Sequence, residues 1–327
     1  MALQARHALP PETQVALESG TMAFFVARRL RDVGLDPQVI DAHEVRAKAV
    51  RPNQKSDRRD ARELCEGLRR DSYHTRVHVP PQAIEQLREL LSRRRHFVSL
   101  QTGEVNAAKR LLRTAGLREL TRSLTSERAW QKLLASLAVA PAVQALCALH
   151  YQLWCCAHEQ VLELEALLEI QGAPLTAQLE RLQTVPGVGP IVAVTVLAVF
   201  ADITRFPTAK HAASYAGLVA STYDSGDRVR HGHITRRGSK ELRAMLCEAA
   251  HHAARPSSPF QPYFTSLVAR RGYKMAVVAV AHRLCRILYA MLRDGREFDP
   301  GKMNVEEGRF EQTTVRRYRR KKLLRSA

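Results

Sequence analysis

Apolar positions near the start of the chain predict a strand, a helix and a second strand. Residues 14–18 read as a short strand that Ser19 and Gly20 close, residues 23–33 have helical spacing that stops at Gly34, and residues 37–41 form a second strand-like run. Two strands joined by one crossover helix lie parallel. We therefore expect an α/β domain over residues 1–79.

The pattern changes after Pro80. Apolar residues then recur on one face of long helices with Arg and Lys between them, at Ile84, Leu87, Leu91, Val98, Val105 and Leu112. This spacing predicts a helical hairpin or coiled-coil connector over residues 80–174, which the Gln-Gly-Ala-Pro break at 171–174 ends.

A third region begins near Leu175 and is mainly helical. Its helical patterns cover residues 240–254 and 274–292, and we place the domain at 175–295. Residues 296–327 contain a run of Arg and Lys and are expected to be a phosphate-binding tail. The predicted fold class is α/β plus α.

Charge points to a polyanionic partner. Lys and Arg number 51 against 32 Asp and Glu, a net charge of +19, and nucleic acid is the obvious counter-charge. A ribosomal or membrane-surface basic protein is the alternative, but the charge is spread among apolar helical positions. The six cysteines form no C-x-x-C pair, and no long apolar run or signal peptide is visible, so we expect a cytoplasmic protein with no membrane partner.

Three carboxylates could form a metal site. Glu18 lies at the carboxyl end of the first strand, and Asp57 and Asp60, three apart, share a helix face. Carboxylates are the ligands that Mg²⁺ prefers, and the ion can stabilise both the attacking and the leaving oxygen of a phosphodiester. A solvated helix face neutralised by neighbouring arginines explains the same pattern.

A glycine-rich turn at residues 185–189 (Val-Pro-Gly-Val-Gly) separates two apolar helical runs. It resembles a helix-hairpin-helix motif, in which Gly187 and Gly189 would let backbone amides approach a DNA phosphate. The alternative is a plain turn between two core helices.

The polar loop at 221–243 is dense with hydrogen-bond donors, a composition that suits the binding of an anion. A serine there could attack a phosphodiester while guanidinium groups stabilise the charge, although by spacing alone Ser225 is only a turn serine. We do not treat His231 and His233 as catalytic. The candidate nucleic-acid ligands are Arg228, Arg230, Arg236, Arg237, Lys240 and Arg243.

Six motifs in order along nearly the whole chain resemble the transposases of insertion-sequence family 110. They are residues 16–20 (Ala-Leu-Glu-Ser-Gly), 55–61 (Lys-Ser-Asp-Arg-Arg-Asp-Ala), 185–189, 216–218 (Ala-Gly-Leu), 225–226 (Ser-Gly) and 234–243 (Ile-Thr-Arg-Arg-Gly-Ser-Lys-Glu-Leu-Arg). Each motif is weak alone, and their order makes the resemblance specific.

The resemblance implies a RuvC-like, ribonuclease-H-type domain, a coiled-coil connector and a C-terminal transposase domain whose serine joins covalently to DNA. Glu18, Asp57 and Asp60 match three of the family's four acidic positions, and Ser225 matches its nucleophile. The resemblance also implies Mg²⁺ as the cofactor, a structured guide RNA as a partner, and assembly as a homodimer or homotetramer.

The sequence departs from the family pattern at its start. The leading Asp of the family should precede Glu18 by several tens of residues, but only 17 residues come before it. We expect an N-terminally truncated chain with a partial RuvC-like domain and impaired catalysis.

The sequence therefore predicts a DNA transposase of an insertion sequence. Two alternatives remain, a nucleic-acid-binding remnant with a broken acidic site and a metal-dependent junction nuclease that uses water in place of serine.

Overall fold

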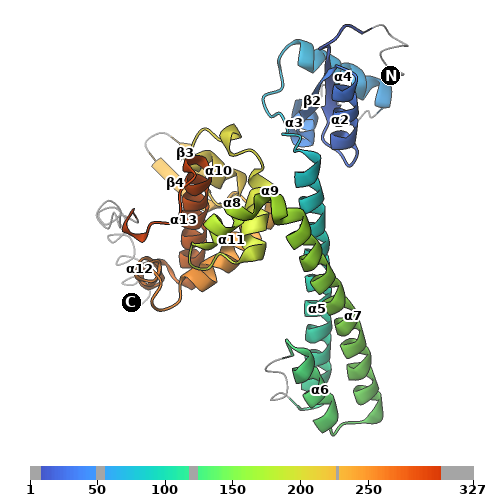
Figure 1. Cartoon of the computed structure of the whole chain (residues 1–327), viewed down its shortest axis with the longest axis vertical. Coiled ribbons are helices and arrows are strands. Elements are labelled where there is room, and N and C mark those ends of the chain that lie inside the picture. Colours follow the sequence, from blue (N-terminus) through green and yellow to red (C-terminus); the bar gives the residue numbers. More distant parts are fainter. Residues whose placement is uncertain (1–8, 49–55, 118–123, 226–227, 303–327) are drawn as a thin grey trace. The chain divides into compact units, whose positions relative to one another are not determined.

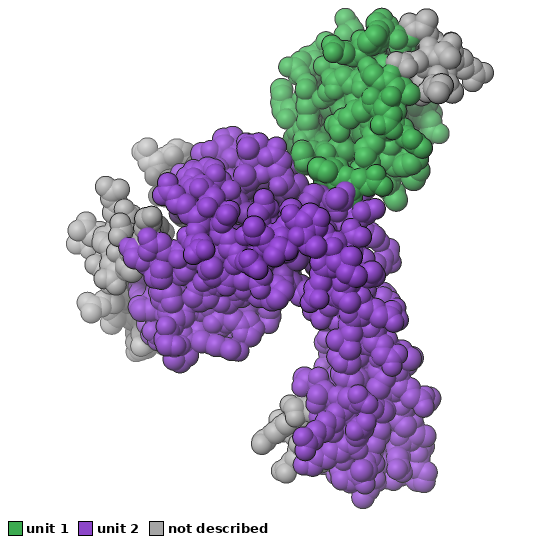
Figure 2. Space-filling model, viewed as in Figure 1, with its two compact units in different colours: residues 1–82 green, residues 83–327 purple. Residues whose placement is uncertain are grey.

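The structure is a computed structural model that describes residues 9–48, 56–117, 124–225 and 228–302. It divides into two compact units, Met1–Gln82 and Ala83–Ala327 (Figure 2). The described part is mainly helical, with two sheets of two strands each (Figure 1). The helical connector and the C-terminal region, which the sequence divided at residue 174, belong to the same unit.

The first unit contains the strand, helix and strand that the sequence predicts. Strand β1 (Gln14–Glu18) pairs in parallel with β2 (Asp36–Ile40), and α2 (Ala23–Asp32) connects them. The helix ends at Asp32, and Gly34 follows with a φ of 79°, which suits glycine. Ala27 of α2 and Val39 of β2 are buried together, so the helix covers one face of the small sheet.

A later segment of the unit continues the sheet beyond β2, after α3 (Ala42–Lys48) and α4 (Asp57–Arg69). Val77 donates its backbone N–H to the Val39 carbonyl at 2.7 Å. Glu44 of α3 accepts hydrogen bonds from the backbone amides of His74 and Thr75 at 2.9 and 2.7 Å. This carboxylate therefore holds residues 74–77 in place against the edge of the sheet.

The second unit begins with a helical arm of α5 (Gln82–Thr114), α6 (Glu127–Ser136) and α7 (Pro141–Gly172). Polar pairs join α5 to α7 in reverse sequence order, so the two helices run antiparallel: Arg94 with Glu165, Gln101 with His158, and Glu104 with His150. A cluster around Trp130 and Trp154 packs α6 against both long helices. The predicted helical hairpin over this region is confirmed.

The C-terminal region contains most of the remaining helices and the second sheet. Its elements are η2 (Ala173–Leu175), α8 (Thr176–Gln183), α9 (Pro190–Phe200), η3 (Ile203–Arg205), α10 (Ala209–Tyr215), β3 (Ala220–Ser225), β4 (Arg228–Ile234), α11 (Lys240–Ala253), α12 (Gln261–Arg271), α13 (Tyr273–Asp294) and η4 (Pro300–Lys302). The predicted helices at 240–254 and 274–292 are confirmed as α11 and α13. The strands β3 and β4 fall in a segment that the sequence analysis treated as a polar loop.

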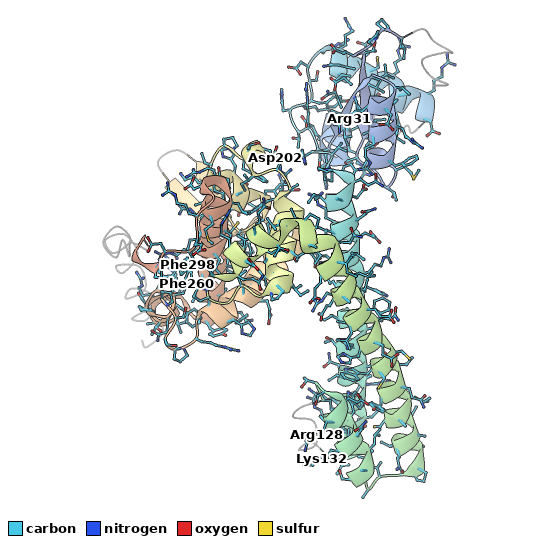
Figure 3. All side chains as sticks on the ribbon, viewed as in Figure 1. Arg31, Arg128, Lys132, Asp202, Phe260 and Phe298 are labelled. Carbon is cyan, nitrogen blue, oxygen red and sulfur yellow. The ribbon has the colours of Figure 1, made fainter. Side chains whose placement is uncertain are left out.

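Helix α13 is the central core helix of this region. By length and composition alone it could cross a membrane. Its buried residues, however, join those of α9, α10 and α11 in one hydrophobic cluster. Tyr289 of α13 donates its hydroxyl to the Phe206 carbonyl at 2.7 Å, and the Phe298 ring stacks on Phe260, with the ring centroids 5.9 Å apart (Figure 3). The chain that follows α13 is thereby tied back to the same core.

Two arginines satisfy the last carbonyl groups of α9, which lack partners within the helix. Arg88 of α5 donates to the Ala198 and Val199 carbonyls at 2.7 and 3.1 Å. Arg205 donates to the Phe200 and Val199 carbonyls at 3.0 and 3.1 Å. Positive charge at a helix C-terminus is favourable, and burial lowers the pKa of Arg88. The arm is therefore fastened to the C-terminal region at the end of α9.

The hydrogen bonds at Glu44 predict a pH-dependent contact in the first unit. The amide of His74, the Lys48 ammonium group and the amide of Thr75 lower the pKa of Glu44 from 4.5 to about 2. A depressed pKa means that the stabilisation is complete above about pH 4.5 and is lost as the pH falls through about 2. We expect Glu44→Gln to reduce the amide protection of residues 74–77 near neutral pH, as measured by hydrogen exchange.

The difference in protection between the wild type and Glu44→Gln should shrink as the pH falls through the same window. Glu63→Gln, on α4, is the control. A difference that stays constant down to pH 2 would show that the Glu44 carboxylate does not hold the segment.

Candidate active site

The first predicted acidic residue, Glu18, ends β1. Its neighbour Ser19 donates a backbone hydrogen bond to the Ile40 carbonyl, which fixes the chain at this end of the sheet. The Glu18 carboxylate lies 4.0 Å from the guanidinium group of Arg46, and the side chains of Glu18 and Arg46 are 40% and 76% exposed. An exposed pair at this distance contributes little to stability.

The other two acidic residues lie in the first turn of α4. Ser56 caps this helix by accepting a hydrogen bond from the Arg59 amide at 3.3 Å. Asp57 is exposed and Asp60 half-buried, and carboxylates at this end of a helix interact favourably with its dipole. Helix α4 packs beside β1, so all three acidic residues lie on elements that contact each other.

These carboxylates are right in kind for a hard divalent cation. Among the described residues, however, no three His, Cys, Asp or Glu side chains are gathered closely enough to hold a metal ion. Glu18, Asp57 and Asp60 all belong to the described part, so the chain does not bring them together as a ready metal centre. Their role as ligands stays a prediction.

Ser225 is the last residue of β3, at the far end of an antiparallel hairpin. Its Cα partner on β4 is Arg228, and Arg230 pairs with Tyr223 two positions further along. Residues 226 and 227, which join the strands, lie outside the described residues. The backbone thus places the predicted nucleophile and two of the predicted arginines at the same end of one hairpin.

The root of this hairpin is held by a close approach of two backbone segments. Gly217, with a φ of 67°, lies so near the other segment that an added Cβ would be 2.5 Å from the Arg237 carbonyl. Gly238, with a φ of 98°, leaves only 2.0 Å between such a Cβ and the Tyr215 carbonyl. Arg236 itself has a left-handed φ of 55°. Neither glycine was predicted as a functional residue, although both stand in the quoted motifs.

Arg243 of α11 completes the root. Its Nη1 donates to the carbonyls of Ala216 and Arg236, each at 3.2 Å, and so joins the two segments. The amide of Arg236 donates to Gly217, and that of Ser239 to Tyr215. The side chain of Arg243 therefore supports the hairpin root. Contact of Arg243 with nucleic acid stays a prediction.

The remaining predicted basic ligands on this side of the hairpin are solvent-exposed. They are Arg236, Arg237 and Lys240, at the end of β4 and the start of α11. Ser239 caps α11 by accepting a hydrogen bond from the Leu242 amide at 3.2 Å. Lys240 is therefore the first residue of a capped helix, and all three side chains can reach a ligand.

The predicted glycine-rich turn lies between α8 and α9, which pack against each other. Gly187 has a φ of 89°, and a Cβ there would be 2.4 Å from the Ala249 carbonyl of α11. Gly189 precedes α9, and a Cβ there would meet open space. Gly187 therefore has a packing reason to be glycine, which is the alternative considered above, and phosphate contact at either glycine stays a prediction.

Comparison with known proteins identifies the family. Residues 179–265 match the family model described as "Transposase IS116/IS110/IS902 family", and residues 2–116 match a transposase model of the IS110 DEDD type. Together they span more than half of the chain. The protein belongs to the IS110/IS116 transposase family.

Individual relatives agree with this assignment. A probable family 20 transposase of Pseudomonas aeruginosa is 29% identical over 90% of this chain and 87% of its own length. The transposase for insertion sequence element IS1111A of Coxiella burnetii is 28% identical over 81% and 73%. A pilin gene-inverting protein of Moraxella lacunata is 34% identical over 36% and 38%.

The family assignment makes this transposase an enzyme that acts on DNA, as the sequence analysis expected. The DEDD type of its N-terminal domain suggests a RuvC-like fold and dependence on a divalent metal ion. The N-terminal match includes Glu18, Asp57 and Asp60, and the C-terminal match includes the hairpin and Ser225.

Alanine substitutions at Gly187 and Gly189 should distinguish a glycine that packs against α11 from one whose Cβ position is open space. We expect Gly187→Ala to lower the free energy of unfolding by about 2–4 kcal/mol, because the new Cβ clashes with the α11 backbone at a left-handed φ. Gly189→Ala, with φ −88°, should cost no more than about 1 kcal/mol. Chemical denaturation followed by circular dichroism measures both, and equal losses would contradict the packing role of Gly187.

The contacts of Arg243 predict a local effect on the hairpin root. Arg243→Ala should lower the amide protection of Arg236 and Ser239 by about tenfold or more, because a charged donor to two carbonyls is lost. Arg237→Ala, which removes an exposed side chain, should leave that protection unchanged. Hydrogen exchange gives the comparison, and unchanged protection in Arg243→Ala would assign this residue to ligand binding alone.

Proposed function

We propose that this transposase cuts and rejoins DNA through a covalent serine intermediate, with Ser225 as the nucleophile. The position of Ser225 at the end of a hairpin with a rigidly held root carries the proposal. A nucleophile must be delivered to a phosphorus atom with little freedom of movement, and an isolated two-stranded hairpin acquires that order from its root.

In the proposed chemistry, each P–O bond that breaks is replaced by a new P–O bond. The Ser225 hydroxyl loses its proton and its oxygen attacks the phosphorus, while the bond to one sugar oxygen breaks and that oxygen takes up a proton. Attack by a sugar hydroxyl of another strand reverses the step and releases the serine. Arg228 and Arg230 would stabilise the charge on phosphate oxygens, since their backbone positions lie at the same end of the hairpin.

The acidic residues would act together with the serine. Glu18, Asp57 and Asp60 would hold Mg²⁺, which as a Lewis acid stabilises negative charge on the reacting phosphate. Serine and acids belong to separate units of the chain, so one copy could supply the serine and another the acids. The exchange of two strands needs at least two copies, which supports a homodimer or homotetramer.

Contacts with the nucleic-acid backbone would come from the exposed basic residues. Arg236, Arg237 and Lys240 are placed to bind phosphates beside the hairpin, and the turn before α9 would add backbone contacts. The net charge of +19 leaves room for a structured guide RNA besides DNA. The name of the Moraxella pilin gene-inverting relative fits a chemistry that rejoins strands as well as cutting them.

The test is a covalent protein–DNA adduct. The full chain is incubated with DNA of the element, RNA transcribed from it and Mg²⁺, and the products are separated under denaturing conditions. We expect an adduct in the wild type and none in Ser225→Ala, because the attacking oxygen is gone. Ser221→Ala, which removes another serine of β3, is the matched control and should still form the adduct.

Two outcomes would contradict the proposal. An adduct that persists in Ser225→Ala would assign the attack to another residue. Cleavage without an adduct that survives in Ser225→Ala and disappears in Asp57→Ala would favour the water-dependent nuclease.

A further inference from the structure

One ion pair joins the arm to the first turn of α11. The Nη1 atom of Arg95 on α5 donates to the Oε2 atom of Glu241 at 2.6 Å. The two side chains are 38% and 23% exposed, so the pair is partly shielded from solvent. A short charge-assisted hydrogen bond of this kind fixes direction as well as distance. It connects segments that lie 146 residues apart in the chain.

Arg95 extends a contact that begins near the start of α5. Leu87 and Leu91 pack against α9, and Arg88 donates to the carbonyl groups at the end of that helix. Arg95 follows Arg88 by about two helical turns and therefore lies on the same face of α5. The face that packs on α9 thus reaches α11 two turns later.

Glu241 lies in the first turn of α11, between two residues that hold the hairpin root. Ser239 caps the helix and donates its own amide to the carbonyl of Tyr215. Arg243 donates to carbonyl groups of both root segments. Residues two apart on a helix project in different directions, so Glu241 is bound to the arm while Arg243 is bound to the root. The first turn of α11 is therefore held between the arm and the hairpin.

Glu241 is an acidic residue among basic ones. Its neighbours Arg236, Arg237 and Lys240 are exposed, and a carboxylate beside them repels the phosphate groups that the proposed function brings there. The guanidinium group of Arg95 offsets that repulsion. A partly exposed ion pair also adds little to the overall stability of the fold. A fixed position of α11 accounts for the carboxylate, whereas phosphate binding and overall stability do not.

We propose that Arg95 is a positioning residue for strand exchange: by binding Glu241 it fixes the first turn of α11, and with it the root of the hairpin that presents Ser225. The inference rests on the proposed function, in which Ser225 is the nucleophile. Attack on phosphorus requires a precise approach of the oxygen, and a displacement of about 1 Å can slow such a step by about 100-fold. Arg95 therefore acts on the rate of attack through the position of the hairpin.

The first test separates position from charge. Single-turnover adduct formation is measured for the full chain with saturating DNA, RNA of the element and Mg²⁺, and the dissociation constant for DNA is measured by fluorescence anisotropy. Glu241→Ala should slow adduct formation by about tenfold or more. It should not weaken DNA binding, because it removes an acid from a phosphate-binding surface. Adduct formation as fast as in the wild type, or faster, would overturn the proposal.

The second test asks whether the two residues act through one contact. Arg95→Ala should slow adduct formation by a similar factor. The double variant Arg95→Ala, Glu241→Ala should be no slower than the slower single variant, because the same interaction is lost in each. Arg95→Lys, which keeps the charge and a donor, should regain part of the rate. Losses that add in the double variant would contradict a shared contact.

Arg94→Ala is the matched control on the same helix. It breaks the ion pair of Arg94 with Glu165, whose atoms are 2.6 Å apart within the arm. The rate of adduct formation should stay at the wild-type value, because this pair does not reach α11. An equal loss in Arg94→Ala would assign the effect to the arm as a whole and remove the specific role of Arg95.

Hydrogen exchange tests the positioning without the serine chemistry. In the free full chain, the amides of Arg236 and Ser239 should exchange faster in Arg95→Ala than in the wild type or in Arg94→Ala. If Ser225→Ala still forms the adduct, the nucleophile is wrong, but faster exchange in Arg95→Ala would still show that Arg95 holds the root. Unchanged exchange would overturn the inference even where Ser225 proves to be the nucleophile.

Discussion

The burial of α9 is the constraint on which the second unit depends. From Val192 to Phe200 every side chain of this helix is buried, so it must be covered on all sides. Helices α8, α11 and α13 and the base of the arm supply that cover. A helix enclosed in this way has to satisfy its terminal polar groups locally. Arg88 and Arg205 do so at its C-terminus, and one of these arginines belongs to the arm.

The same core determines where the hairpin leaves the protein. Helix α10 lies in the cluster with α9 and α13 and ends at Tyr215, beside Gly238 of the returning chain. Arg205 lies 4.5 Å from the centre of the Tyr215 ring while its Nε and Nη2 bond the end of α9. The core helix, the arginine and the hairpin root are thus connected through consecutive contacts. The hairpin is thereby connected to the core through its root.

Periodicity predicted the elements that bury a regular face. The parallel pair β1 and β2, the arm helices, α11 and α13 all follow from apolar spacing, because each packs one face on a neighbour. The hairpin β3 and β4 did not follow, because residues 220–234 are mostly polar and show no regular alternation of apolar residues. The hairpin is held by the contacts of Gly217 with residues 236 and 237, of Gly238 with Tyr215, and by the side chain of Arg243. Such contacts between segments have no periodic signal.

The candidate site could likewise be predicted only in part from the sequence. The motifs selected Glu18, Asp57, Asp60 and Ser225, but which of the basic residues are structural could be learned only from the fold. Arg243 and Arg237 are equally basic in the sequence, yet the first bonds two carbonyls and the second is exposed. The glycines at 187 and 189 likewise suggest phosphate contact, whereas Gly187 lies against backbone atoms of α11 in the same chain.

Lys and Arg are unevenly distributed over the second unit. Basic residues gather around the hairpin root and the start of α11, where Arg236, Arg237 and Lys240 are exposed, while α7 contains no Lys or Arg. In a chain with a net charge of +19, α7 is thus a helix without positive side chains, and several of its exposed residues are leucines. An exposed apolar face costs solubility unless another surface covers it.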